Sequence, residues 1–577
     1  MPPKPKMEVV EQDPDAIFNE GFLADVYQQN PVSATGIDMV KTRFPPGNQT
    51  DISTLDMRKQ SQSILGLHET AEDVYYESIE ETVRWLGFEP AQITYSSDNF
   101  DRLYELAELL IEEDEPEIEA SRGGRLGKAR YACAHRDRPT CESLAEFRAM
   151  RDGKYEPHEA SLRMKQDLED GNPQMWDLTA YRVRNKPHHR TGNKWRIYPT
   201  YDFTHCLCDS FEDITHSLCT TEFELSRVSY EWLCDKVKIY KPMQREYGRL
   251  NLSGVLTSKR KINELVSNKH VRGWDDPRLY TLNGLRRRGV PPGAILAFVN
   301  ELGVTKATSE IQVKRFDQTV RSFLETSVPR LMLVLDPVLV VIEDLPDDHL
   351  EMVEVPFSKD PKFGAHKVPF TKSLFIDHSD FREVDSKDYF RLAPGKSVGL
   401  LKVPYPITAT SFETDPATGL VSSIRAKYEK PVDGGHFKKP KTYIQWVANS
   451  PQHGSPISAE VRVFNPLFTP ESLETHGDIN PKSEESFPNA IIETGFCEIE
   501  RRAPWPAIMT ESKLVDQANE ETISTDATVE ATKGRLNPES VRFQGMRVAY
   551  FCVDKDSCKE KVVLNRIVSL KEDSRKG

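Results

Sequence analysis

The sequence lacks the long apolar runs that membrane and secreted proteins need. Its longest run, LMLVLDPVLVVIEDL, is interrupted by Asp336 and Pro337 and is too short to cross a bilayer as a helix. The first residues, MPPKPKMEVVEQDPD, contain no apolar core, so they do not predict a secretory signal. The sequence therefore predicts no membrane partner and no passage through the secretory pathway.

Cysteines at regular spacing are also missing. The 577 residues include nine cysteines, an odd number that forms no repeated framework. Secreted domains that depend on disulfides carry even numbers of cysteines at characteristic spacings, whereas thiols stay reduced in the cytosol. This usage favours a cytoplasmic protein with free thiols.

An excess of positive charge is missing too. The chain has 76 Lys and Arg against 90 Asp and Glu, a net charge of -14. A chain this acidic does not bind nucleic acid indiscriminately, so any contact with RNA or DNA must come from a local basic patch. Its length exceeds what one core can organise and predicts two to four domains.

The residues that are present divide into two halves near residue 330. Before it, DVYYESIEETVRWLGF and a segment with Phe100, Leu103, Ala107 and Leu110 on one face predict two amphipathic helices. The segment ITYSSD between them predicts a strand. After residue 330, short runs such as KTYIQWVAN and MRVAYFCVD alternate with Pro, Gly and Asp, which is typical of antiparallel barrels or sandwiches. The pattern predicts an α/β front half and an all-β back half.

The strongest charge signal is the segment RVRNKPHHRTGNKWR, which contains no acid. Such a segment can be a solvated surface, but in so acidic a chain an acid-free patch favours contact with phosphate. Trp195 and the pair Thr191 and Gly192 within it favour a nucleic-acid end over a small anion. The predicted RNA-binding residues of this segment are Arg182, Arg184, Lys186, Arg190, Lys194 and Arg196.

Two further segments carry side chains that can do chemistry. TSKRK precedes an apolar-periodic helix, and its lysines can hold phosphate oxygens, although a surface turn is the alternative. YDFTHCLCDSFEDITHSLCTTEF contains two histidines and three cysteines, but Cys206 and Cys208 are too close together for a zinc hairpin, and buried core thiols are the alternative. Tyr201 and Asp202 open this segment, where open α/β sheets place ligand groups.

Several motifs, taken in order, resemble the glutaminyl-tRNA synthetase family of class I aminoacyl-tRNA synthetases. They are YPTYDFTHCLCDS, ITHSLCTTEFE, EYGRLNL, SKRK and GWDDPRLYTLNGLRRRG. The likeness covers nearly everything from Val40 to Leu570 and is strongest to eukaryotic cytosolic members, fungal ones in particular. The glutamate-specific relatives are the nearest alternative, but YDFTHCLCDS followed by THSLCTTEF matches the glutamine version.

The resemblance implies an enzyme that attaches glutamine to its tRNA through a glutaminyl-adenylate. It would use ATP with Mg²⁺ as a substrate complex and would need no tightly bound cofactor and no resident metal. The implied fold is α/β plus all-β. Its segments are a polar tail (1–39), the truncated first half of a class I Rossmann-like catalytic domain (40–96), an acceptor-stem-binding insertion (97–200), the second catalytic half (201–260), a helical domain (261–330) and two anticodon-binding β-barrels (331–577).

The resemblance also assigns roles to single residues. Tyr201 and Gln244 would bind glutamine. The implied ATP-binding residues are Thr220, Arg249, Leu250, Thr257, Ser258 and Lys259. Among these, Lys259 with Ser258 would act in catalysis by stabilising charge that develops on the phosphates. The implied tRNA-binding residues of the barrels are Lys367, Lys441, Arg462, Gln544 and Arg547.

One part of the family pattern is missing. In the family, RFPP is followed by a nucleotide loop of the type E-P-N-G-x-L-H-I-G-H and later by a strand that ends in F/Y-D-D-T-N. This chain has neither, and residues 47–76 occupy the gap; a second gap lies near residues 112–117. Two alternatives to an active enzyme are therefore open. One is a chain that binds tRNA without forming the adenylate, and the other is an incomplete gene model of the enzyme.

Overall fold

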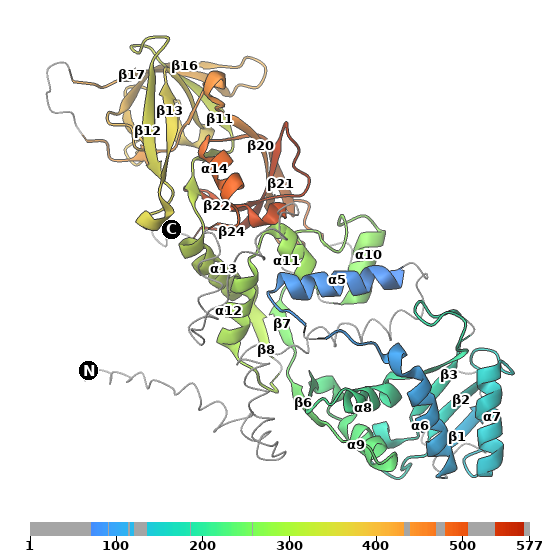
Figure 1. Ribbon diagram of the computed structural model, residues 1–577. Coiled ribbons are helices and arrows are strands. Elements are labelled where there is room, and N and C mark those ends of the chain that lie inside the picture. The colour runs from blue at the N-terminus through green and yellow to red at the C-terminus, as the bar shows by residue number, and fades with distance from the viewer. Residues whose placement is uncertain are drawn as a thin grey trace, which may run out of the picture. The chain divides into compact units, whose positions relative to one another are not determined.

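The computed structural model consists of two compact units, which are described separately (Figure 1). The first comprises Met1–Leu250 with Gly303–Ser309, and the second comprises Asn251–Leu302 with Glu310–Gly577. The structure describes residues 71–90, 92–113, 116–120, 135–184, 186–256, 258–307, 309–431, 439–468, 479–505 and 537–570. The predicted tail, the RFPP segment and Thr257 lie outside these ranges.

Two amphipathic helices open the described part of the first unit, as the sequence predicts. They are α5 (Ala71–Trp85) and α6 (Phe100–Glu112). The residues expected on the apolar face of α6 are all buried: Phe100, Leu103, Ala107 and Leu110. The strand predicted at ITYSSD is wrong, because Ser96–Asn99 forms a 3-10 turn in which the Asp98 carboxylate accepts a hydrogen bond from the Tyr95 N–H.

An antiparallel sheet and a third helix follow α6. The sheet has the order β1-β2-β3-β4, with β1 (Pro116–Ala120), β2 (Ala160–Met164), β3 (Thr179–Val183) and β4 (Ile197–Pro199). Helix α7 (Thr140–Asp152) lies next to α6 and β1. Apolar residues of these elements form one core with the helices that come next in the chain, and this core includes Phe147, Tyr181 and Phe203.

The candidate site is built on the segment that follows β4. It comprises α8 (Tyr201–Phe211), β5 (His216–Thr220), α9 (Arg227–Lys236) and β6 (Met243–Tyr247). Strands β5 and β6 are parallel and pair Ser217 with Gln244. A parallel pair needs a crossover connection, which α9 supplies here. Within the described residues this sheet contains only these two strands.

The second unit contains helices that pack on one another and on the strands behind them. They are α10 (Lys259–Ser267), α11 (Leu282–Arg288), α12 (Pro292–Leu302) and α13 (Val313–Ser327). Phe298 and Phe316 meet edge to face with ring centroids 5.2 Å apart, and they share a core with Tyr550 and Ile567. Strands β7 (Leu250–Ser253) and β8 (Ser309–Gln312) form a separate two-stranded sheet.

The back half is built mainly of two seven-stranded, barrel-like sheets, in agreement with the strands predicted there. One has the order β18-β15-β16-β17-β11-β14-β19 and the other β10-β21-β20-β24-β23-β22-β9. The strands of the first are β11 (Pro337–Ile342), β14 (Ser373–Asp377), β15 (Ser397–Leu400), β16 (Ile407–Thr414), β17 (Val421–Tyr428), β18 (Tyr443–Ile444) and β19 (Val447–Ala448).

The second barrel-like sheet draws its strands from both ends of this half. They are β9 (Arg330–Leu331), β10 (Leu333–Val334), β20 (Ile457–Phe464), β21 (Glu484–Ile492), β22 (Arg542–Gly545), β23 (Ala549–Val553) and β24 (Val562–Ser569). Strands β12 (Leu350–Pro356) and β13 (Ala365–Thr371) form a separate ribbon, and α14 (Gly495–Arg502) follows β21.

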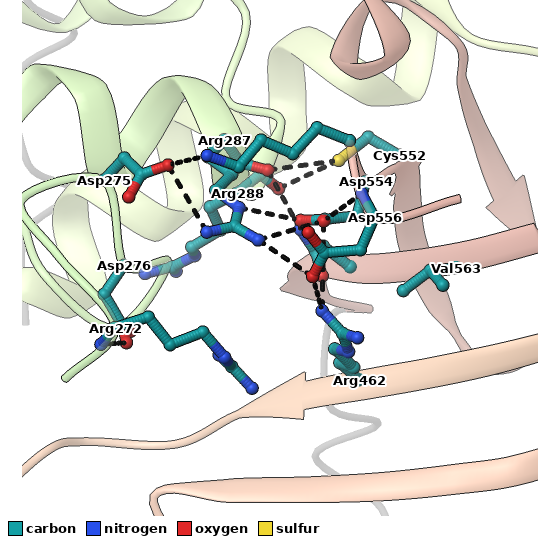
Figure 2. Close-up of polar contacts among 12 residues, drawn as sticks. Arg272, Asp275, Asp276, Arg287, Arg288, Arg462, Cys552, Asp554, Asp556 and Val563 are labelled. Carbon is teal, nitrogen blue, oxygen red and sulfur yellow. Dashed lines mark hydrogen bonds and ion pairs between the residues drawn. The ribbon is translucent and has the colours of Figure 1, made fainter. Parts of the chain in front are cut away.

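A buried arginine joins α11 to the second barrel-like sheet (Figure 2). Arg287 donates through Nε and Nη2 to the two carboxylate oxygens of Asp554, each at 3.1 Å, and its Nη2 also reaches Asp556 at 3.0 Å. The Arg287 carbonyl accepts a hydrogen bond from Asn565 at 3.0 Å. The guanidinium is almost fully buried, and the two carboxylates offset the free-energy cost of removing its charge from water.

Two kinds of feature are absent from the described ranges. None of the helices there has the length and apolarity needed to cross a membrane. In the same residues, no three His, Cys, Asp or Glu side chains are grouped so that they could hold a metal ion. Cys206 and Cys219 are instead fully buried in the protein interior, as the core-thiol alternative predicts.

Candidate functional site

Tyr201 begins α8, and its hydroxyl is linked to a buried histidine one turn further along the helix. The Tyr201 hydroxyl lies 2.9 Å from His205 Nδ1, and the two rings stack with centroids 5.0 Å apart. Residues four apart lie on the same helix face, which explains this contact. Phe223 contacts the Tyr201 ring with centroids 5.5 Å apart.

The other nitrogen of His205 faces a buried carboxylate. His205 Nε2 lies 2.9 Å from Asp209 Oδ2 and 3.1 Å from Ser217 Oγ. The Ser217 hydroxyl donates to the same Asp209 oxygen at 2.7 Å, and the Tyr230 hydroxyl donates to it at 3.0 Å. Burial raises the pKa of Tyr230, and the nearby Asp209 raises it further, so this phenol stays protonated as a donor. We call Tyr201, His205, Ser217 and Asp209 the Tyr201 relay.

With Asp209 ionised and the His205 ring neutral, the contacts of the relay determine which atoms carry protons. The Asp209 carboxylate can only accept hydrogen bonds. The Ser217 hydroxyl donates its single hydrogen to Asp209, so toward His205 Nε2 it can only accept. In the neutral ring, Nε2 therefore carries the proton and Nδ1 accepts one from the Tyr201 hydroxyl. The Tyr201 oxygen can then act toward a ligand only as a hydrogen-bond acceptor.

Gln244, on the neighbouring strand β6, also offers a hydrogen-bond acceptor. Its amide nitrogen donates to the Phe223 carbonyl and to Glu246 Oε1, both at 3.1 Å, so the two amide hydrogens are used. The Gln244 carbonyl oxygen is left as an acceptor. Although burial alone would raise the pKa of Glu246, hydrogen bonds from Arg227 and Gln244 outweigh it and lower the pKa, which keeps Glu246 ionised.

The predicted ATP-binding residues of the first unit lie at the carboxyl ends of β5 and β6. Thr220 ends β5 and is buried, and its hydroxyl has no hydrogen-bond partner among the described residues. Arg249 follows β6 and lies 3.7 Å from Glu222, with both side chains largely in solvent. Leu250 is exposed. Carboxyl ends of parallel strands are where such sheets bind ligands.

Ser258 and Lys259 belong to the second unit. Ser258 is the N-cap of α10, where its carbonyl accepts the first helical hydrogen bond, from the Ile262 N–H at 2.9 Å. Lys259 is the first residue of that helix. The helix N-terminus carries a partial positive charge, which favours anions at this position.

The predicted RNA-binding segment forms a turn between β3 and β4, and we call residues 182–196 the basic hairpin. His188 and Gly192 exchange two backbone hydrogen bonds at its tip. Two of its cations are neutralised locally, because Arg190 lies 2.7 Å from Asp98 and Lys194 lies 2.6 Å from Asp101. The other four form no ion pair with any described residue: Arg182, Arg184, Lys186 and Arg196.

A cavity of about 450 Å³ lies under the basic hairpin, and Arg184, Lys186 and Arg196 line it. Trp195 also lines it but is otherwise a core residue, packed 5.4 Å from the ring of Tyr104. The expectation that Trp195 stands ready for a nucleic-acid end is therefore wrong, because its ring completes the core of the first unit. The Trp195 indole N–H has no hydrogen-bond partner among the described residues.

The predicted tRNA-binding residues of the barrels differ in their exposure and in the contacts that they already make. Lys367 is exposed on β13, and the Lys441 ammonium lies 5.0 Å from the centre of the Phe390 ring. Arg462 is mostly buried and is held by Glu460 at 2.9 Å and by Asp556 at 2.6 Å (Figure 2). Gln544 lies on β22, and Arg547 follows in the turn, where it pairs with Asp380 at 3.1 Å.

Comparison with known proteins relates this arrangement to one enzyme family. The model described as tRNA synthetases class I (E and Q), catalytic domain, matches residues 68–326. The model described as tRNA synthetases class I (E and Q), anti-codon binding domain, matches residues 328–429.

Three fungal relatives decide between the two amino acids in these descriptions. A glutamine–tRNA ligase of Hypocrea virens is 51% identical, and the alignment covers 100% of this chain and 90% of that protein. A probable glutamine–tRNA ligase of Schizosaccharomyces pombe is also 51% identical, over 97% of this chain and 72% of that protein. A glutamine–tRNA ligase of Saccharomyces cerevisiae is 49% identical over 97% and 73%. The chain belongs to the glutamine–tRNA ligase family.

Membership in the glutamine–tRNA ligase family confirms the resemblance seen in the motifs, and the glutamate-specific alternative is not favoured. The alignment with the Hypocrea virens ligase also bears on the missing loop. It extends over 623 positions, 46 more than the 577 residues of this chain. The relative therefore has residues inside the aligned stretch that this chain lacks. The catalytic-domain model begins its match at residue 68, after the RFPP segment.

The motifs predict Tyr201 and Gln244 as glutamine-binding residues but do not predict the groups that hydrogen-bond to them. Asp209, Ser217 and Glu246 carry no motif of their own, and the sequence suggested no hydrogen-bonding role for His205. A signal was present, since Tyr201, His205 and Asp209 recur every four residues and so share one face of α8. Ser217 could not be found this way, because strand pairing and helix packing bring it to that face.

Proposed function

We propose that this chain attaches glutamine to its cognate tRNA in the cytoplasm. Membership in the glutamine–tRNA ligase family is the observation that carries the proposal. The substrates are glutamine, ATP with Mg²⁺, and the tRNA. The glutamine carboxylate attacks the α-phosphate of ATP and releases pyrophosphate. A ribose hydroxyl at the tRNA end then attacks the activated carbonyl and releases AMP, which leaves an ester of glutamine and tRNA.

The polarity of the Tyr201 relay supports glutamine as the amino acid. Tyr201 and Gln244 both offer an acceptor oxygen toward the side-chain pocket. The glutamine side chain ends in an amide whose NH₂ donates two hydrogen bonds, whereas an ionised glutamate side chain has acceptors only. Glutamate would leave buried acceptors facing one another, and sites of this kind reject such a mismatch by about 10⁴ or more.

The nucleotide is assigned to Thr220, Arg249, Leu250, Thr257, Ser258 and Lys259. In this proposal Lys259 neutralises charge that builds on the phosphates while pyrophosphate leaves. A pre-organised group of this kind contributes about 10²–10³ to the rate. The start of α10 adds backbone N–H groups that favour an anion.

The tRNA is assigned to the basic hairpin and to the barrels. Arg182, Arg184, Lys186 and Arg196 form no ion pair with a described acid, which supports contact with the phosphate backbone. Lys367, Lys441, Gln544 and Arg547 are the proposed anticodon contacts. Arg462 is the weakest of these assignments, because its guanidinium already serves Glu460 and Asp556.

Charging of the glutamine tRNA by the purified full chain tests the proposal. Glutamyl transfer should be slower than glutaminyl transfer by about 10⁴ or more in kcat/KM. Lys259→Ala should lower the charging rate by about 10²–10³ while tRNA binding survives, and Lys261→Ala, a change in an exposed lysine two residues on, serves as the matched control. Equal charging with both amino acids would refute the assigned specificity.

One second candidate is a chain that holds tRNA without making the adenylate. This chain is 46 residues shorter than its 623-position alignment, and the described β5–β6 sheet has two strands. Glutamine-dependent ATP–pyrophosphate exchange separates the two candidates when it is measured in this chain and in a version with the family's nucleotide loop inserted. Tight tRNA binding with exchange only in the second protein would identify a binding chain, and exchange in both would exclude it.

A further inference from the structure

A short segment of the first unit lies against the turn that ends β6, and we call residues 303–307 the strap. In the chain it follows α12, and Gly303, with a left-handed φ of 69°, lets the backbone leave that helix. The strap is exposed along its whole length. None of the sequence motifs includes it.

A close backbone contact at Gly248 holds the strap against the end of β6. The Gly248 N–H donates to the Thr305 carbonyl at 2.6 Å. A Cβ at position 248 would clash with the carbonyl oxygen of Ala307, so any side chain larger than that of glycine would displace the strap. The contact therefore fixes where the strap, and Lys306 within it, crosses the end of β6.

Lys306 reaches from the strap to two acids of the first unit. Its ammonium lies 3.2 Å from Glu224, which follows the 3-10 turn Thr221–Phe223, and 3.7 Å from Glu246 on β6. The Glu246 side chain is fully buried, whereas the side chains of Lys306 and Glu224 are about half exposed. Lys306 thus approaches a buried carboxylate from the solvent side.

Glu246 determines which end of the Gln244 amide faces the ligand. Its Oε1 accepts from the Gln244 amide nitrogen at 3.1 Å and from Arg227 Nε at 2.9 Å, and its Oε2 contacts Arg227 Nη2. An ionised Glu246 can only accept, so Gln244 must turn its NH₂ group toward it and its carbonyl oxygen away. A protonated Glu246 could donate instead, which would allow the amide of Gln244 to rotate by half a turn.

Two cations keep the Glu246 carboxyl ionised. Burial alone would raise the pKa of Glu246, but its hydrogen bonds and the charges of Arg227 and Lys306 together lower it. These are the charged groups of the described residues that act on Glu246. Arg227, on α9, also lies near Glu224 and Glu231. A single arginine thus faces several acids, and Lys306 supplies a second positive charge.

We propose that Lys306 is a positioning residue for the glutamine pocket, because it keeps Glu246 ionised and so holds the carbonyl oxygen of Gln244 toward the amide of the ligand. Lys306 acts through Glu246 in this role and needs no contact with a substrate. The inference rests on the proposed function, since it takes Gln244 to bind glutamine. It makes the choice of amino acid depend on an exposed segment outside the pocket.

Equilibrium binding of glutamine and of glutamate to the full chain, measured by calorimetry with the glutamine tRNA present, tests the proposal. Lys306→Met should raise the Kd for glutamine about threefold to fivefold, the effect of losing one half-exposed ion pair, and should lower the preference over glutamate by at least as much. The Kd for ATP should not change. Lys306→Arg keeps the charge and should restore most of the affinity. Lys241→Met is the matched control, because this half-exposed lysine of the same unit pairs with Asp235 at 2.9 Å.

Two further measurements separate positioning from a general structural effect. The Kd for glutamine should rise more steeply in Lys306→Met than in the wild type as the pH falls from about 8 to about 5.5, because Glu246 takes up a proton more readily without the nearby cation. In Glu224→Gln, Lys306 keeps its contact with Glu246, so the Kd should stay near that of the wild type. A Glu224→Gln variant as defective as Lys306→Met would show that Lys306 acts only by tying down Glu224, and would overturn the proposal.

The remaining outcomes keep this inference separate from the proposed function. Lys306→Met with unchanged glutamine binding, or with weaker tRNA binding as its only defect, would overturn the positioning role. So would a wild type that binds neither amino acid. A wild type whose glutamine affinity depends on Lys306 but which charges no tRNA would support the positioning role and refute the proposed function. A wild type that charges tRNA, beside a Lys306→Met variant of full affinity, would do the reverse.

Discussion

The Tyr201 relay and the basic hairpin lie in the same unit, yet their polar groups are held in different ways. At the relay, Ser217, His205 and the neighbouring Tyr230 all lie within 2.7 to 3.0 Å of one buried oxygen of Asp209. In the basic hairpin, Arg184 and Lys186 have no ion-pair partner among the described residues, and Arg190 and Lys194 share theirs with solvent.

This difference separates selectivity from affinity. The donor and acceptor roles in a buried hydrogen-bond network cannot be reversed without leaving a polar group unpaired. The network therefore determines which ligand group can bind. Exposed cations are screened by salt and can move with the ligand, so they contribute attraction without fixing its chemistry. Variants of the relay should therefore change which amino acid is used, and variants of the hairpin should change how tightly tRNA binds.

The largest effect is expected from Asp209→Asn. The new amide can donate to His205 Nε2, so the ring can move its proton to Nδ1 and the Tyr201 hydroxyl can become a donor toward the ligand. The preference for glutamine over glutamate in tRNA charging, measured as a ratio of kcat/KM values, should fall on the order of 10². Asp213→Asn, the same change at an exposed position four residues on, should leave the ratio unaltered. An unchanged ratio in Asp209→Asn would show that the relay does not set the polarity of Tyr201.

Tyr230→Phe removes a hydrogen bond to Asp209 that does not determine whether the Tyr201 hydroxyl donates or accepts. Asp209 would lose one of its hydrogen bonds, but His205 Nε2 would still face the carboxylate. The free energy of unfolding should fall by about 1.5–3 kcal/mol, the usual value for a buried hydrogen bond to a charged group. Urea denaturation measures this loss, and Tyr240→Phe, at an exposed tyrosine, is the control. Selectivity for glutamine should persist, and its loss would mean that Tyr230 also orients the relay.

In the basic hairpin, Arg184→Gln and Arg196→Gln should weaken tRNA binding by about five- to tenfold each at low salt, since each removes a proposed phosphate contact. The slope of log Kd against log salt should fall by about 0.7–0.9 for each contact. Arg190→Gln should have a smaller effect, because Arg190 would have to leave Asp98 to reach a phosphate. The same Kd change for all three variants would show that the ion pairs seen here do not compete with the tRNA.

These regions also differ in how far the sequence predicts them. The basic hairpin was found from charge alone, because six cations without an acid need no partner from elsewhere to be noticed. The acids that neutralise Arg190 and Lys194 come from residues about ninety positions away and could not be inferred. The same limit applies to Asp209 with Ser217 and to Asp380 with Arg547, pairs that only the tertiary fold creates.

The fold shows the same pattern. The helical periodicity of α6 and the short strands after residue 330 were predicted, because local spacing determines which face is buried. The strand expected at ITYSSD was wrong, because the side chain of Asp98 closes a 3-10 turn there. Trp195 was read as a ligand contact from its place among cations, but its ring is needed to fill the core.

The smallest effect is expected from His188, a partly buried histidine of the basic hairpin. Burial, together with the nearby His189, Arg190 and Arg184, lowers the pKa of His188 from 6.5 to about 4. Its Nδ1 accepts from the N–H groups of Arg190 and Thr191, at 3.2 and 3.4 Å, so protonation at that atom would break the tip of the turn. The neutral ring is thus the form that the fold requires.

Because the pKa of His188 is lower in the folded state, the unfolded chain binds more protons between pH 6.5 and about 4. The stability contributed by neutral His188 is fully present above pH 6.5 and is lost as the pH falls through this window. The loss should be about 1 kcal/mol once solvent screening of a half-buried ring is allowed for.

In His188→Asn the amide oxygen can accept the same backbone hydrogen bonds without titrating. Its melting temperature should therefore fall less than that of the wild type between pH 7 and pH 5, whereas His158→Asn, at an exposed histidine, should follow the wild type. Identical pH dependence in all three proteins would show that His188 titrates normally and that the hairpin tip does not depend on its charge.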